Sequence, residues 1–162
     1  MKEFFSLDNL NKSPAVFDIE KFSWVNSMQI KNQNNDSLLS QLDIKFIPEI
    51  DPNKALDIAK NKVSNMIQLK ENLLFCESRK IKIDQTLFKL INNEQKSILK
   101  KFSDYYINIS PDTHDEIKTC FNNFLTVNEL KMKELALPLR IVLTGTMSSP
   151  GIFEILDLLG AE

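Results

Sequence analysis

The chain has 162 residues, of which 43% are hydrophobic and 26% are charged, with a formal net charge of −2. This length allows one domain of ordinary size or two small ones, and the composition excludes a disordered chain. No apolar run approaches the roughly 18 residues of a membrane-spanning helix, and the N-terminus lacks the apolar core of a secretory signal. We therefore expect a cytoplasmic protein without membrane contact.

The residues that usually carry catalysis or hold metals are scarce. Cys76 and Cys120 lie far apart without a second ligand pair or Cys-x-x-Cys spacing, so we expect two buried free thiols and no metal site. His114, the single histidine, borders the apolar stripe of its own helix and is interpreted as a packed or surface residue. No glycine-rich phosphate loop of either common type occurs. We predict no catalytic residue in this chain.

Charge is unevenly distributed along the sequence. Between Lys54 and Lys101 there are eleven Lys and Arg against five Asp and Glu, whereas the remainder is acidic. A basic stretch can neutralise phosphates whatever the overall charge, and acidic flanks limit non-specific binding. A lysine-rich solvated surface is the alternative interpretation.

Apolar residues recur at helical spacing, and no convincing alternation of period two occurs, so we predict an all-α fold, a helical bundle. Trp24 is interpreted as a core anchor of the first helix rather than a stacking surface for RNA. Four helices are expected in the first half, and polar residues cap the second and the third of them, Asp36 or Ser37 and Asp51. These helices run from Asp18 to about Ile30, from Asp36 or Ser37 through Leu42, from Asp51 to about Val63, and over 64–75.

The second half follows a break in the helical period at 77–83. We expect a long helix capped by Asp84 and running through Phe102, then a helix opened by Ser110 and Pro111. Two further helices should end the chain, with a proline in the first turn of each. The expected terminal signals are Pro138 and Pro150 in first turns, Ser149 as an N-cap and Gly160 as a C-terminal stop.

Two sequence blocks, one near each end, carry more information than any other. The last 25 residues contain Pro138-Leu-Arg, Leu143-Thr-Gly, Pro150-Gly-Ile-Phe-Glu and Leu158-Leu-Gly, with a polar corner before Pro150. Near the N-terminus, Asn11-Lys-Ser-Pro-Ala-Val-Phe-Asp precedes Glu20-Lys-Phe-Ser-Trp-Val-Asn. In this order and at about this separation, the blocks resemble those of bacterial glutamyl-tRNA synthetases, where they frame the anticodon-binding region.

The resemblance implies a division of the chain into three parts. Residues 1–33 would end the stem-contact region, and 34–78 and 79–162 would be two small helical anticodon-binding subdomains of a class I glutamyl-tRNA synthetase. That family handles ATP and glutamate with a His-Ile-Gly-His-like motif and a Lys-Met-Ser-Lys-Ser-like loop, and neither is present here. We therefore expect a C-terminal portion of an ATP-dependent glutamate-tRNA ligase, inactive alone, without ATP or another cofactor, and with Met1 an artificial start.

The resemblance also implies residues that read the anticodon. Arg140 occupies the Pro-Leu-Arg arginine, and Ser149, Pro150 and Ile152 fall where the family's corner approaches anticodon bases. Capping by Ser149 and Pro150 and core packing of Ile152 are the alternative. Lys62 is the nearest match to a basic residue, arginine in stricter members, that checks the third base. Without a clear arginine there, we predict that tRNA(Gln) is accepted beside tRNA(Glu).

Further basic residues are candidates for contacts with the tRNA backbone. They are Lys60, Lys70, Arg79, Lys80, Lys82, Lys89, Lys96 and Lys100. The predicted function is to position tRNA(Glu) for charging with glutamate in translation, as a monomer that binds no DNA. The alternative is a helical protein-interaction domain without RNA binding, which should respond little to salt.

Overall fold

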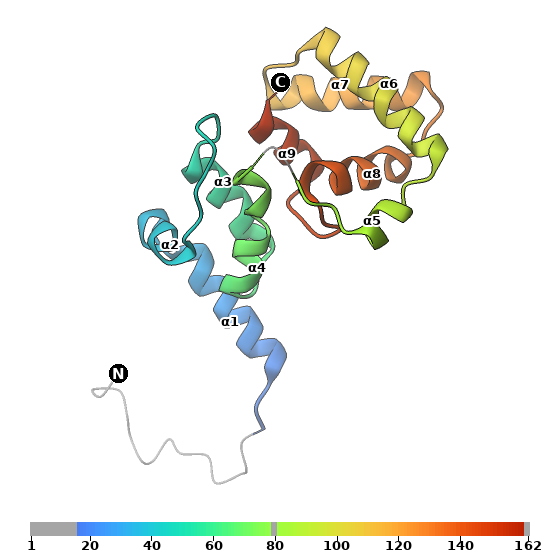
Figure 1. Cartoon of the computed structure of the whole chain (residues 1–162). Coiled ribbons are helices and arrows are strands. Elements are labelled where there is room, and N and C mark those ends of the chain that lie inside the picture. Colours follow the sequence, from blue (N-terminus) through green and yellow to red (C-terminus); the bar gives the residue numbers. More distant parts are fainter. Residues whose placement is uncertain (1–15, 79–80, 161–162) are drawn as a thin grey trace, which may run out of the picture.

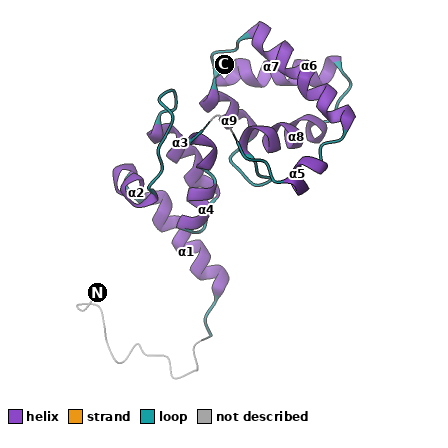
Figure 2. Cartoon of the chain, in the orientation of Figure 1, coloured by secondary structure: helices purple, strands orange, loops and turns teal. Residues whose placement is uncertain are grey.

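The computed structural model describes residues 16–78 and 81–160, and in these ranges the chain forms helices and loops without a strand (Figures 1 and 2). The all-α prediction is confirmed. The elements are α1 (Ile19–Asn32), α2 (Asn35–Leu42), α3 (Pro52–Ala59), the 3-10 turn η3 (Lys60–Lys62), α4 (Met66–Glu71), the 3-10 turn η4 (Leu74–Cys76), α5 (Gln85–Lys89), α6 (Asn93–Ile109), α7 (His114–Val127), α8 (Met132–Thr144) and α9 (Ile152–Leu159).

The buried side chains fall into two hydrophobic clusters. The first core joins α2, α3, α4 and η4, with Leu38, Leu56 and Leu69 fully buried. The second core joins α6, α7 and α8 around Phe102, whose ring lies 5.3 Å from that of Phe121 at an interplanar angle of 67°. Such edge-to-face pairs stabilise a core beyond the area they bury. The boundaries 1–33, 34–78 and 79–162 stay a prediction.

Helix α9 belongs to both cores. Its Ile155 and Leu158 pack in the first core, whereas its Ile152 and Leu156 pack in the second. Residues three or four apart share one face of a helix, so α9 presents two different apolar faces to two different partners. In Figure 1 α9 accordingly lies between α3 and the group formed by α7 and α8. This helix fixes how the two cores sit against each other.

The predicted cap at Asp51 is confirmed, and an aspartate caps the first helix as well. The Asp18 carboxylate accepts a hydrogen bond from the Lys21 N–H at 3.0 Å, and Asp51 accepts one from the Asn53 N–H at 2.9 Å. The cap of α2 was wrongly predicted at Asp36 or Ser37. Asn34 caps it instead, because its side chain accepts from the Asp36 N–H at 2.7 Å. An asparagine before two further polar residues is as good a cap as an aspartate.

The single long helix expected from Asp84 through Phe102 is wrong. Asp84 caps only the short α5, and α6 starts afresh after Asn92. The Asn92 side chain accepts from the Gln95 N–H at 2.8 Å, and the Gln95 side chain accepts from the Asn92 N–H at 3.0 Å. This reciprocal capping box satisfies two N–H groups that a helix start leaves unpaired. The spacing Asn92-x-x-Gln95 was the missed signal.

The helix start expected at Ser110 is also wrong. Ser110 ends α6 in the left-handed region, with φ +46°, and α7 begins at His114 after the cap Thr113. Glu116 completes a capping box there, since its carboxylate accepts from the Asp112 and Thr113 N–H groups. These hydrogen bonds lower the pKa of Glu116.

Two proline signals near the C-terminus were misplaced. Pro138 is buried inside α8 rather than in a first turn, so the Glu134 carbonyl loses its usual intrahelical donor. Helix α9 begins at Ile152 with Gly151 at the cap position, two residues after Pro150. The Ser149 hydroxyl therefore caps nothing and bonds instead to the Pro150 carbonyl at 3.2 Å. Gly160 ends α9 with φ +74°, as predicted.

Helix α1 exposes most of its apolar residues. Trp24 is 64% exposed, so its assignment to the core was wrong. The apolar side chains exposed on and just before α1 are Val16, Phe17, Ile19, Phe22, Trp24, Val25 and Met28. The helix is held near its C-terminal end, where Ile30 is buried and the Asn26 side chain donates to the Ser64 carbonyl.

Candidate nucleic-acid interface

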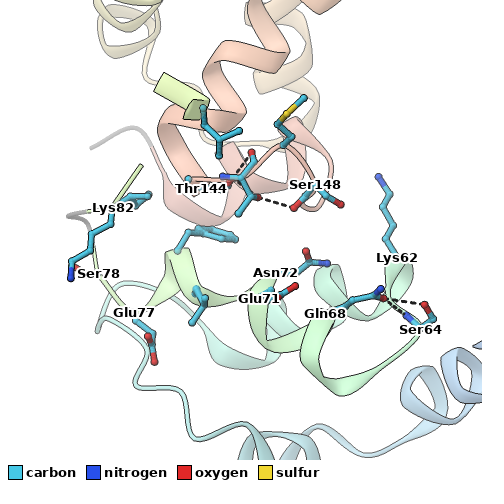
Figure 3. A pocket seen from close by; sticks show the side chains of 17 residues that line it. Lys62, Ser64, Gln68, Glu71, Asn72, Glu77, Ser78, Lys82, Thr144 and Ser148 are labelled. Atoms are coloured by element: carbon cyan, nitrogen blue, oxygen red, sulfur yellow. Dashed lines mark hydrogen bonds between the residues drawn. The ribbon is translucent and has the colours of Figure 1, made fainter. Parts of the chain in front are cut away.

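A cleft of about 1190 Å³ opens between the two cores (Figure 3). One wall comes from η3, α4 and η4, and the opposite wall is the corner between α8 and α9, residues 144–148. The link between the cores, with Glu77, Ser78, Ile81 and Lys82, closes one end. Figure 3 shows Thr144 and Ser148 on one side, facing Gln68 and Asn72 on the other.

The 144–148 corner is held rigid by its own hydrogen bonds. The Thr144 hydroxyl donates to the Arg140 carbonyl at 2.9 Å, and the Thr146 hydroxyl donates to the Ser148 carbonyl at 2.7 Å. Gly145 has φ +70°, and a Cβ there would lie 2.9 Å from Ile81 Cγ2 and 3.1 Å from the Lys82 carbonyl oxygen. Glycine is therefore required for both conformation and space. The corner leaves Met147 and Ser148 exposed at the cleft.

The α4 wall is ordered by the start of its helix. The Asn65 side chain accepts from the Gln68 N–H at 2.8 Å, and Gln68 Oε1 accepts from the Ser64 N–H at 2.9 Å. Asn72 lies one turn further along the same face of the helix. Its side-chain amide has no hydrogen bond in the parts of the chain that the structure describes. It can both donate to and accept from a bound polar group.

The lining of the cleft mixes charged, polar and apolar groups. Lys62 and Lys82 are balanced by Glu71 and Glu77, so charge alone does not define this surface. Leu74 is 45% exposed and Met147 is 48% exposed. Their side chains add solvent-exposed apolar area to the cleft. Apolar area beside unpaired amide, hydroxyl and ammonium groups suits a splayed-out nucleobase, which has a flat apolar face and polar edges.

The structure separates the predicted site residues. Lys62 is exposed and lines the cleft, whereas Ser149, Pro150 and Ile152 do not line it. Pro150 is buried, and Ile152 is only 4% exposed and packs in the second core. Ile152 therefore offers no accessible apolar surface, as the alternative interpretation held.

Arg140 lies one turn before Thr144, on the same face of α8. The side chain is half-buried, and its Nε is buried with no hydrogen-bond partner among residues 16–78 and 81–160. A buried donor without an acceptor is uncommon in a folded protein and calls for an explanation. Arg140 does not line the cleft itself, but it stands next to the corner that does.

The candidates for contacts with the tRNA backbone divide into a buried lysine and exposed lysines. Lys60 is 8% exposed, and its ammonium group donates to the Gln33 carbonyl at 2.9 Å and to the Asn35 side chain. It links η3 to the end of α1 and the start of α2, so we correct its assignment: its donors are already used. The candidates that are exposed in the structure are Lys70, Lys82, Lys89, Lys96 and Lys100. Arg79 and Lys80 lie outside the described residues.

Sequence reasoning missed the polar and apolar residues of the α4 wall, Gln68, Asn72 and Leu74. The spacing Asn65-x-x-Gln68 was an available signal for the helix start, because it has the form of a capping box. Nothing in the sequence placed this wall opposite the 144–148 corner, since the two are at least 70 residues apart.

The two cysteine thiols are protected by burial. Cys76 and Cys120 are buried free thiols, as predicted. Burial raises the pKa of the Cys76 thiol to about 12 and also raises the pKa of Cys120, so neither is an active nucleophile. Among residues 16–78 and 81–160, no three His, Cys, Asp or Glu side chains gather as metal ligands. None of the helices in those ranges has the length and hydropathy to cross a bilayer.

A cleft lined by apolar, amide, hydroxyl and ammonium groups has the chemistry to bind exposed bases of RNA loops. Residues 16–162 match the family described as the anticodon binding domain, and the chain belongs to that family. The family named by resemblance in the sequence is thereby confirmed.

Three relatives illustrate the similarity. Glutamate-tRNA ligase 1 of Campylobacter hominis is 33% identical, with 100% of this chain and 36% of the relative covered. Glutamate-tRNA ligase of Syntrophobacter fumaroxidans is 27% identical over 99% of this chain and 36% of its own length. Glutamate-tRNA ligase 1 of Aliarcobacter butzleri is 29% identical over 100% and 36%. The chain thus spans little more than a third of the length of these relatives.

Proposed function

We propose that this chain is the anticodon-binding part of a glutamate-tRNA ligase and that it holds tRNA(Glu) while the rest of the ligase charges it with glutamate. The relatives carry that name, and the whole of this chain aligns with them. Activation of glutamate by ATP would take place in the part of the ligase that this chain does not cover. Charging of tRNA for translation belongs in the cytoplasm, and we propose that location.

The cleft between the cores is the observation that carries this proposal. It presents Lys62, Asn72 and Ser148 around the half-exposed Met147, which is what a flipped-out base needs for edge contacts and for a face contact. We propose that anticodon bases enter here. The corner would contribute main-chain and hydroxyl contacts through Ser148, and Ser149 and Pro150 would act by shaping the corner rather than by touching a base.

Arg140 would supply a charged donor next to the same corner. Arg140 is only half-buried, and an RNA phosphate or base edge would bind its guanidinium. An arginine has a planar set of donors that lysine lacks, so Arg140→Lys should lose affinity although it keeps the charge.

Lys62 would meet the third anticodon base. A lysine is a flexible point charge with no fixed pair of parallel donors, so it discriminates between bases less than an arginine does. We therefore propose that tRNA(Gln) is bound as well as tRNA(Glu). The exposed Lys70, Lys82, Lys89, Lys96 and Lys100, together with Arg79 and Lys80, would hold the RNA backbone.

Binding to anticodon stem-loops of tRNA(Glu) and tRNA(Gln), and to versions with each anticodon base changed, tests the proposal at two salt concentrations. We expect anticodon changes to weaken binding by about 1–3 kcal/mol for each base that is read. Lys62→Ala should reduce the dependence on the third base. Lys45→Ala is the matched control, because Lys45 is exposed in a loop away from the cleft.

Two results would contradict the proposal. If affinity does not depend on the anticodon sequence, the cleft does not recognise anticodon bases. If affinity hardly changes with salt concentration, the protein-interaction alternative is favoured. Failure to bind the tRNA(Gln) stem-loop would leave anticodon binding intact but would refute the relaxed third-base check.

A further inference from the structure

We propose that Asp157 of α9 is a positioning residue that fixes the two walls of the cleft relative to each other, through a side-chain bridge across the junction between the two cores. This inference rests on the proposed function, because it concerns the same cleft. The bridge consists of Lys54 of α3, Asp157 of α9 and His114 of α7, and we call it the Asp157 bridge.

The geometry joins both cores through one carboxylate. Asp157 Oδ1 lies 3.1 Å from the ammonium of Lys54, which belongs to the first core's side. Asp157 Oδ2 lies 3.9 Å from His114 Nδ1, at the start of α7 on the second core's side. Lys54 also donates to the Asp157 carbonyl at 3.3 Å, one of the last four carbonyls of α9 that have no intrahelical partner.

Each charge of the bridge is placed against the preference of its own helix. Asp157 is in the last turn of α9, where the helix dipole disfavours an anion, and Lys54 is in the first turn of α3, where it disfavours a cation. Local helix formation therefore does not explain these residues, whereas their mutual pairing does. The Asp157 side chain is only 23% exposed, so water screens the pair less than it screens a fully exposed one.

The imidazole of His114 is held in place independently of the carboxylate. Its ring meets that of Phe153 edge-on, at 6.5 Å between centroids and an interplanar angle of 87°. Phe153 lies on α9, as Asp157 does, and packs against the second core, so His114 contacts α9 through two residues. The carboxylate thus has one partner anchored on each side.

The bridge bears on the cleft through α3 and η3. Lys54 and Lys62 lie eight residues apart on this continuous helical segment, roughly 12 Å along its axis. Lys62 lines both the cleft and a smaller hollow of about 530 Å³ that contains the Asp157 bridge. When α3 is pinned to α9, Lys62 is therefore held at a set distance from the 144–148 corner, which leads directly into α9.

The test separates the bridge from RNA binding by measuring each on its own. Spin labels at Ser40→Cys on α2 and Asn123→Cys on α7 report the distance between the cores, and the buried Cys76 and Cys120 leave these exposed sites selectively labelled. Asp157→Asn should broaden the distance distribution and weaken binding of the tRNA(Glu) anticodon stem-loop by about three- to fivefold. The charge swap Lys54→Asp with Asp157→Lys re-forms only the pair between α3 and α9, so it should restore both quantities in part.

Glu154→Gln is the matched control, because Glu154 lies on the same helix, lines the same hollow and has no ion pair in the described part of the chain. An unchanged distance distribution in Asp157→Asn overturns the inference, and so does a broadened one with unaltered RNA affinity. If the unsubstituted chain itself binds no stem-loop, the proposed function fails, while the distance measurement still decides whether the bridge sets the geometry.

Discussion

Helices α1 and α9 are both rich in apolar residues, yet they are stabilised in opposite ways. Helix α1 has a side-chain cap from Asp18 but exposes Ile19, Phe22 and Trp24. Helix α9 has no side-chain cap but buries Ile155 completely. Its other buried residues are divided between the two cores. Local signals can therefore start a helix, whereas burial decides how much that helix contributes to the stability of the whole.

The largest effect expected from this comparison concerns a matched pair of isoleucines. Ile155→Ala removes a fully buried side chain where the first core meets α9, and should lower the free energy of unfolding by about 2–5 kcal/mol. Ile19→Ala removes an isoleucine that is 69% exposed and should change it by no more than about 0.5 kcal/mol. Urea denaturation measures both. Equal losses would show that α1 is buried in solution.

A smaller effect is expected where α1 is attached to the rest of the chain. Lys60→Met leaves the Gln33 carbonyl and the Asn35 side chain without their buried donor, at a cost of about 1–3 kcal/mol. Lys62→Met, two residues further on, removes an exposed ammonium and should be nearly neutral for stability. Amide hydrogen exchange should locate the loss from Lys60→Met around 30–35. A neutral Lys60→Met would mean that its hydrogen bonds do not hold α1.

Loss of a cap side chain should affect α1 more than α9, the opposite of the order expected for loss of an apolar side chain. Asp18→Ala should destabilise α1 locally by about 1 kcal/mol, seen as faster amide exchange in its first turn without a change in global unfolding. Ser149→Ala should leave the exchange of α9 unaltered, because its hydroxyl bonds to the Pro150 carbonyl and caps no N–H. Faster amide exchange in α9 of Ser149→Ala would show that Ser149 does cap this helix, as the sequence predicted.

The smallest effect is expected in thiol labelling, which should be slow in the unsubstituted chain. With its pKa raised to about 12, roughly one Cys76 thiol in 10,000 is ionised at pH 8, so labelling should require unfolding. Cys76 shares the first core with Ile155, so Ile155→Ala should accelerate its labelling, whereas Ile19→Ala should not. Rapid labelling of the unsubstituted chain would contradict the burial of this core.

Helix starts were predictable only where one cap candidate stood alone. Asp18 and Asp51 each precede a clear apolar stripe, and both are caps. Around Ser110 and Ser149, by contrast, a hydroxyl before a proline competed with a second cap a few residues later. The hydrogen bond actually formed depends on where the neighbouring helix packs, and that is a property of the folded chain.

The candidate site was partly visible in the sequence. Lys62 was selected from the resemblance and lines the cleft, whereas Ser149, Pro150 and Ile152, selected on the same ground, do not. Lys60 was selected with the other lysines because composition treats all of them alike, although its ammonium is buried against a carbonyl. Sequence counts charges, but only the packing of η3 against α1 and α2 shows which charges remain available.

The sequence by itself determined the helical class, the family, the two cysteines as buried thiols and Gly160 as a helix stop, because periodicity and residue geometry act over a few neighbouring residues. Only the tertiary structure decided which apolar faces are covered, how α9 joins the two cores, and that Asn72 stands opposite Ser148 across a cleft. Those outcomes depend on contacts between segments distant in the chain, whose pairing no local pattern encodes.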